Sequence, residues 1–206
     1  MSTQARTRLA RVAVIEAART LFIERGYGAT TIDAISALAD VPSATLYRLF
    51  SSKLGILKAL LDVSIAGDPE PVPVADRPSV QSLFADPEQK RMIARFVGVV
   101  ARINSRTAPV YRILVSAADT DPEAATLLAE LTGQRQQGQG RLAHALAQNA
   151  ALRAKLKERE AADIIHGLAS PELYGLFVSD RGWPLKRYEK WLTDLLIDQL
   201  LAAERV

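Results

Sequence analysis

Few side chains in this sequence are suited to covalent, redox or metal chemistry. There is no cysteine, and the two histidines, His144 and His166, lie far apart in the chain without an HExxH or GxSxG motif beside them. Asp163 and His166 share a helix face, but two ligands do not make a metal site. The sequence therefore predicts no enzyme, no cofactor and no bound metal.

Hydrogen-bonding side chains gather instead in the run TTIDAISALADVPSATLYRLFSSK, residues 30–53. The threonine hydroxyls at its start can cap a helix, and Asp33 follows Thr30 at the spacing of a capping box. Pro42 ends this first helical pattern and suits the start of a second one. In the second pattern Leu46 and Phe50 are four residues apart and face inward. The opposite side carries small polar residues with a tyrosine and an arginine: Ser43, Ala44, Thr45, Tyr47 and Arg48.

Two short helices joined by a tight turn form a helix-turn-helix, whose second helix can enter the major groove of DNA. An ordinary helical hairpin has the same spacing. Charge adds support, because residues 1–65 hold 8 Lys and Arg against 5 Asp and Glu, whereas the remainder holds 18 of each. The whole net charge of +3 thus accompanies the helix-turn-helix, as phosphate contact requires.

The run from Ile15 to Leu61 resembles the DNA-binding domain of the TetR family of bacterial transcription regulators. The resemblance rests on AARTLF, RGY, the Thr-Thr start, Thr45-Leu46-Tyr47, Phe50 and Lys53. It implies that Thr31, Tyr47 and Lys53 bind phosphates. It also implies that Ser43, Ala44, Thr45 and Arg48 approach base edges. Among the departures from the family pattern, Asp33 replaces a frequent arginine and Asp40 a usual glycine.

The expected fold is all-α, in three parts. Residues 1–66 form a DNA-binding domain, in which a first helix from Thr7 to Arg25 has an apolar stripe that begins with Leu9 and Val12. Residues 67–85 form a proline-rich linker or loop. Residues 86–206 form a helical ligand-binding and dimerisation domain, in which one helix opens at Asp86-Pro87-Glu88, another at Thr107-Ala108-Pro109 and another at Asp121-Pro122-Glu123.

The family resemblance implies an effector cavity in the C-terminal domain and a homodimer interface on its last helices. The candidate cavity residues are Met92, Phe96, Val100, Tyr111, Leu114, Leu128, His144 and Tyr174, with Arg95 or Arg102 as polar anchors. The candidate interface residues are Ile165, Leu173, Phe177, Trp191, Leu192, Leu195 and Leu196. The same residues could simply pack a core.

The expected function is that of a sequence-specific transcription regulator, a repressor that an apolar or aromatic small molecule releases from a near-palindromic operator. No secretory signal or membrane span is evident, so a cytoplasmic bacterial protein is expected. A helical ligand-binding protein without DNA activity is the alternative. The sequence identifies neither the operator, the controlled genes nor the effector.

Overall fold

The structure, a computed structural model, describes residues 3–67 and 72–202. Over these ranges the chain is helical, with one isolated bridge between Leu152 and Leu201, and the expected all-α class is confirmed. The residues form two compact units, the first made of 1–68 and 109–130 and the second of 69–108 and 131–206. The division into three domains remains a prediction.

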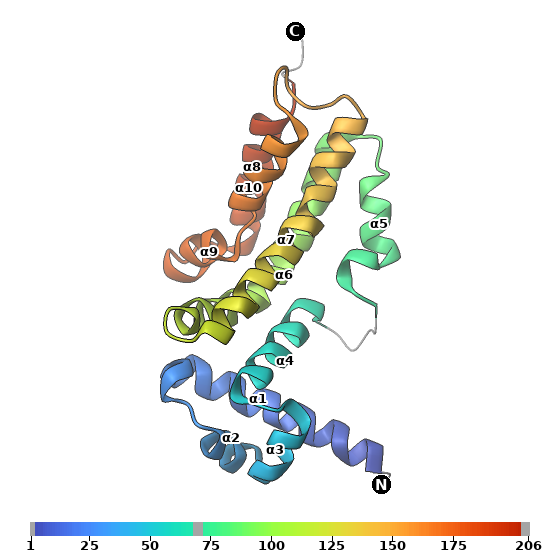
Figure 1. Cartoon of the computed structure of the whole chain (residues 1–206). Coiled ribbons are helices and arrows are strands. Elements are labelled where there is room, and N and C mark those ends of the chain that lie inside the picture. Colours follow the sequence, from blue (N-terminus) through green and yellow to red (C-terminus); the bar gives the residue numbers. More distant parts are fainter. Residues whose placement is uncertain (1–2, 68–71, 203–206) are drawn as a thin grey trace. The chain divides into compact units, whose positions relative to one another are not determined.

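The first unit begins with four helices, α1 (Thr3–Ala29), α2 (Ile32–Ala39), α3 (Ser43–Phe50) and α4 (Lys53–Ala66) (Figure 1). Residues 109–130 add the end of α6 (Gln89–Ala118) and the start of α7 (Pro122–Gln148). Gly26 has φ 78° and ψ 168°, so the regular part of α1 ends there as expected. Burial on α1 begins at Val14, which leaves Leu9 and Val12 57% and 54% exposed; their predicted place in the buried stripe is wrong.

The second unit contains the rest of α6 and α7 and all the remaining elements. These are η1 (Val74–Asp76), α5 (Pro78–Phe84), α8 (Glu158–Leu168), α9 (Pro171–Tyr174), the π-helical η2 (Gly175–Asp180) and α10 (Leu185–Leu200). Their apolar faces meet in one core, in which Met92, Val97, Leu142, Ile165 and Leu192 are fully buried. This burial is the main force that holds the unit together.

Two expectations about helix boundaries are wrong. The segment 67–85 is not loop throughout, because Pro78 stands at the start of α5 and Leu83 anchors that helix in the core. Proline is well suited to a first turn, so it starts this helix instead of preventing it. No new helix starts at Thr107-Ala108-Pro109 either, since α6 continues through Pro109, where packing outweighs the lost backbone hydrogen bond.

Both Asp-Pro-Glu motifs start helices, as the sequence predicts. The Asp86 carboxylate accepts a hydrogen bond from the Glu88 backbone N–H, and Asp121 accepts one from that of Glu123. Asp86 also receives two hydrogen bonds from Arg91 and one from Arg95. These contacts, of which the hydrogen bond from Arg91 has the largest effect, hold the pKa of Asp86 well below its usual range.

Candidate nucleic-acid interface

The two ends of α2 are defined by the residues that cap them. Thr31 caps α2 by accepting a hydrogen bond from the Ala34 N–H at 3.1 Å. Thr30 was also expected to cap this helix, but its side chain is buried and its hydroxyl donates a hydrogen bond to the Gly26 carbonyl at 2.8 Å. The capping box with Asp33 is therefore wrong. At the other end of α2, Asp40 adopts the left-handed conformation, φ 51°, in the position where a glycine was expected.

The exposed side of α3 carries the residues that were expected to contact DNA. Leu46 and Phe50 are buried in the first unit, so the orientation of the helix is fixed. Ala44, Tyr47 and Arg48 are exposed, and Ser43 and Thr45 are half-buried. With Thr31 exposed at the start of α2, six of the seven predicted contact residues present polar or small groups at the surface of this motif.

Lys53, the seventh, lies in a different setting from the one predicted. Its ammonium group donates hydrogen bonds to the Tyr27 and Thr30 carbonyls at 2.8 and 2.9 Å and lies 4.2 Å from the centre of the Tyr27 ring. Burial lowers the pKa of Lys53, and burial together with Asp121 and Glu123 raises the pKa of Tyr27 to about 12. Two of the three ammonium N–H groups are thus used inside the chain, and a phosphate would have to take the third.

Gly55 permits an unusually close approach of α3 and α4. A Cβ atom placed on Gly55 would lie 1.9 Å from the Phe50 carbonyl oxygen, well inside any allowed contact. Ser52 caps α4 by accepting a hydrogen bond from the Gly55 N–H at 3.0 Å. Sequence reasoning missed this glycine, because a glycine near a helix start gives no sign of what lies opposite it.

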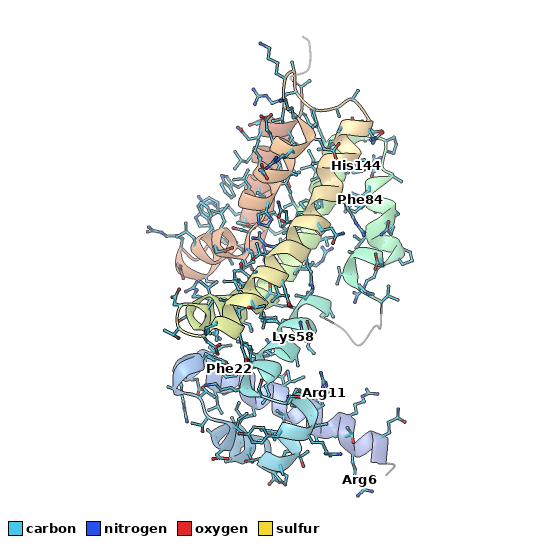
Figure 2. The ribbon with its side chains drawn as sticks, viewed as in Figure 1. Arg6, Arg11, Phe22, Lys58, Phe84 and His144 are labelled. Atoms are coloured by element: carbon cyan, nitrogen blue, oxygen red, sulfur yellow. The ribbon has the colours of Figure 1, made fainter. Side chains whose placement is uncertain are left out.

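The basic residues at the start of the chain lie on a helix. Arg6, Arg8 and Arg11 belong to α1, which is regular from Thr3 onward, so an extended basic arm is not formed over these residues. Arg6 and Arg11 are labelled in Figure 2, and the Arg11 guanidinium lies 4.8 Å from the centre of the Phe50 ring. Arg11 therefore packs on the C-terminal end of α3 while its charge stays at the surface.

The expected cavity residues are divided between the two units. Met92, Phe96, Val100 and Tyr174 are buried in the second unit, whereas Tyr111, Leu114 and Leu128 belong to the first. His144 is exposed and pairs with Glu158 at 3.0 Å, so its predicted place in a cavity is wrong (Figure 2). The proposed anchors are also unsuited, because Arg95 is bound to Asp86 and Ser82 and Arg102 is exposed.

A polar network inside the second unit escaped the sequence analysis. Arg135 donates to the His166 ring and to its backbone carbonyl, both at 3.0 Å, and Gln139 contacts the other ring nitrogen at 3.0 Å. Burial and the Arg135 charge lower the pKa of His166. Within residues 3–67 and 72–202, the buried polar atoms Arg135 Nε and Tyr188 Oη have no hydrogen-bond partner. Among the described residues, no three His, Cys, Asp or Glu side chains are grouped as a metal site would need.

Some of the expected interface residues are fully buried within the chain and the others are partly exposed. Ile165, Leu192 and Leu196 are fully buried within the single chain, so a second copy cannot touch them and these three assignments are corrected. Leu173, Phe177, Trp191 and Leu195 are partly exposed. Phe177 and Trp191 have their ring centres 4.6 Å apart, and the neighbouring Leu176 is 45% exposed.

The fold and the exposed face of α3 define a helix-turn-helix protein, and comparisons with known proteins agree. The family description "Bacterial regulatory proteins, tetR family" matches residues 14–60. An uncharacterised HTH-type transcriptional regulator of Bacillus subtilis, YdeS, is 30% identical over 169 residues, which cover 81% of this chain and 78% of YdeS. A second B. subtilis regulator, YvkB, is 42% identical over 48 residues, 23% of this chain and 25% of YvkB.

Solved structures show the same fold at lower identity. The Stenotrophomonas maltophilia repressor SmeT, in complex with triclosan, has 18% identity and a TM-score of 0.67 over 93% of this chain and 91% of SmeT. FadR from B. subtilis with stearoyl-CoA has 19% identity and a TM-score of 0.68, over 90% of this chain and 97% of FadR. NalD of Pseudomonas aeruginosa, a repressor of a multidrug efflux pump, has 18% identity and a TM-score of 0.67, over 93% of this chain and 96% of NalD.

The chain belongs to the TetR family of bacterial regulatory proteins. It is a DNA-binding transcription regulator and not an enzyme. In the part of the chain that the structure describes, no helix is long and apolar enough to cross a membrane.

Proposed function

We propose that this regulator is a homodimeric repressor that binds a near-palindromic operator and leaves it when a small molecule binds. Operator binding is supported by the exposed face of α3, because Leu46 and Phe50 on the opposite face are buried in the core and fix the orientation of the helix. In a dimer two such helices would enter successive major grooves about 34 Å apart. Repression in the bacterial cytoplasm is part of the same proposal.

The contacts divide into two kinds. Thr31 and Tyr47 stand at positions suited to the phosphate backbone, whereas Ser43, Ala44, Thr45 and Arg48 lie on the part of α3 that faces base edges. Arg48 is the only residue of this set that can offer two parallel donors to one guanine. The recognition surface is small and weakly charged, so we expect its affinity to depend strongly on a few contacts.

Selection of bound duplexes from a random library tests the proposal directly. A near-palindromic motif, with half-sites one helical turn apart, is the expected result. Failure to enrich any sequence, together with no salt-dependent affinity for duplex DNA, would favour the alternative of a ligand-binding protein without DNA activity.

Replacement of Arg48 by alanine should relax base preference at particular operator positions. The loss of a bidentate base contact corresponds to about 1–3 kcal/mol of discrimination there. Lys58→Ala, which removes an exposed positive charge from α4, is the matched control and should leave the preferred sequence unchanged. The selected motifs of the two variants and of the wild type provide the measurement, and identical motifs for Arg48→Ala and wild type would refute the base-contact role.

The dimer interface is proposed on the partly exposed apolar side chains of α9, η2 and α10. Leu173, Phe177, Trp191 and Leu195 can each meet a partner, and Leu176 joins them as an exposed leucine. Burial of such a surface between two copies would remove it from water.

Leu176→Glu should therefore convert the dimer to a monomer at micromolar concentration, because a charge would be buried in the interface. Val63→Glu is the control, since Val63 on α4 is also 45% exposed and lies outside the proposed interface. Sedimentation velocity measures the difference. A dimer that persists in Leu176→Glu would place the interface elsewhere.

The effector is proposed to be an apolar molecule with a hydrogen-bonding group. Support comes from the second unit, in which Met92, Phe96, Val100 and Tyr174 are buried and the Tyr188 hydroxyl and Arg135 Nε lack partners. These two atoms replace Arg95 and Arg102 as candidate anchors. The complexes of SmeT with triclosan and of FadR with stearoyl-CoA are examples of this fold with ligands that have an extended apolar part. Thermal shift with apolar phenols and fatty acyl compounds tests this part, and absence of any stabilised complex would count against it.

A further inference from the structure

A hydrogen bond joins the two helices of the helix-turn-helix at its exposed surface. The Ser43 hydroxyl donates to Oδ1 of Asp33 at 2.8 Å, across ten residues of sequence. Asp33 lies in the first turn of α2 and is exposed, and Ser43 is the first residue of α3. An acid is thus held beside the end of the recognition helix that approaches base edges.

The bond determines which hydrogen-bonding groups this pair can offer to DNA. A serine hydroxyl has one hydrogen, and here Asp33 receives it, so that only acceptor lone pairs remain on Ser43. The carboxylate of Asp33 has acceptors alone, and no further donor to it is found among the described residues. The pair therefore presents acceptors only.

In the major groove this arrangement discriminates among the four bases. Guanine offers only the acceptors N7 and O6, and thymine offers an acceptor and a methyl group, so both would place acceptor against acceptor. Adenine has a donor at N6, but the acceptor N7 lies beside it and repels a carboxylate. Cytosine has the N4 amino donor alone. We propose that Asp33, oriented by Ser43, recognises a cytosine in each operator half-site, which rests on the proposed operator binding.

A purely structural role for Asp33 makes a different prediction. Pro42 at the start of α3 has no side-chain acceptor, so a nearby carboxylate can stabilise the positive end of the helix dipole. In that case loss of the charge would lower the melting temperature and leave base preference unchanged. Asp33→Asn separates the two roles, because the amide oxygen can still accept from Ser43 while the amide N–H₂ adds a donor.

The test compares duplex selection and quantitative binding for wild type, Asp33→Asn and Asp40→Asn. Asp40 is an exposed acid at the other end of α2, with its backbone in a conformation that asparagine also tolerates, so Asp40→Asn is the charge-matched control. Wild type and Asp40→Asn should prefer cytosine at one position of each half-site. Asp33→Asn should change that preference to adenine, whose N6 and N7 match an amide, by about tenfold in relative affinity. Ser43→Ala should weaken the preference for cytosine, because the carboxylate loses the contact that orients it.

The outcomes that overturn the inference are distinct from failure of the proposed function. If wild type enriches no duplex at all, operator binding itself fails and the inference falls with it. If wild type selects a clear operator and Asp33→Asn selects the same bases, operator binding stands and recognition by Asp33 is refuted. A lower melting temperature of Asp33→Asn with an unchanged motif assigns Asp33 to the helix dipole alone.

Discussion

Replacement of Gly55 by alanine should destabilise the helix-turn-helix by about 3 kcal/mol and abolish operator binding at ordinary temperature. The added Cβ would lie 1.9 Å from the Phe50 carbonyl oxygen and 3.1 Å from its carbonyl carbon. These are backbone atoms, so the clash cannot be relieved by rotation of a side chain. Phe50 cannot move freely either, because its ring is buried and its carbonyl accepts a hydrogen bond from the Ser52 N–H at 2.8 Å.

The clash would force α3 away from α4, and the recognition surface would move with it. Gly28→Ala is the matched control, because nothing lies within 4 Å of a Cβ atom there. Its thermal stability should stay close to that of the wild type, because the added methyl group meets no other atom and Gly28 has no positive φ. Thermal unfolding and operator titration of both variants provide the measurement. Wild-type stability of Gly55→Ala would show that the helices can separate without cost.

Replacement of Lys53 by methionine should lower the free energy of unfolding by about 2–3 kcal/mol. The methylene stem is preserved, whereas two charge-assisted hydrogen bonds to the Tyr27 and Thr30 carbonyls and the contact with the Tyr27 ring are lost. These carbonyls belong to the end of α1 and the residue that follows it, so Lys53 ties the first turn of α4 to the residues that lead into the helix-turn-helix. Its place at the start of a helix, where the dipole disfavours a cation, is explained by this contact.

Lys58→Met removes the same charge from the exposed side of α4 and serves as the control (Figure 2). It should leave unfolding unchanged within about 0.5 kcal/mol. Salt titrations of operator binding, made below the unfolding temperature, add the second measurement. If Lys53 acts mainly inside the protein, the salt slopes of Lys53→Met and wild type will agree. A melting temperature equal to that of wild type with a slope reduced by about one would assign the ammonium to a phosphate.

Local sequence signals predicted α2 and α3 well, whereas several side-chain partners in the first unit and the exposure of Leu9 and Val12 on α1 differ from the prediction. The apolar spacing of Leu46 and Phe50 and the break at Pro42 predicted α2, α3 and the turn between them. The same signals could not say that Thr30 also donates to the Leu21 carbonyl, nine residues away, or that Asp33 accepts from Ser43, ten residues away, because these partners meet only after the chain turns. Capping residues reveal a helix start, but two adjacent threonines compete for that role.

Beyond α4 the sequence predicted helices more reliably than the burial of their side chains. The Asp-Pro-Glu motifs mark the starts of α6 and α7. Because proline is unfavourable within a helix, Pro109 predicts a helix start, yet packing along α6 outweighs that cost and the helix continues through it. Apolar stripes such as that of α10 could equally cover a core or a partner, and only the fold shows that Leu192 and Leu196 are inside.

The sequence by itself determined that this protein is all-α, that it carries a helix-turn-helix with a small polar recognition face, and that it belongs among TetR regulators. The all-α class and the helix-turn-helix follow from periodicity, capping and turn residues, which act over a few positions of the chain, whereas the family follows from the resemblance of residues 15–61. The tertiary structure alone decided the partner of each side chain: Lys53 on the carbonyls that precede α2, Gly55 against Phe50, and Asp33 with Ser43. Such pairings depend on how the chain turns between one helix and the next, and no periodic pattern encodes those turns.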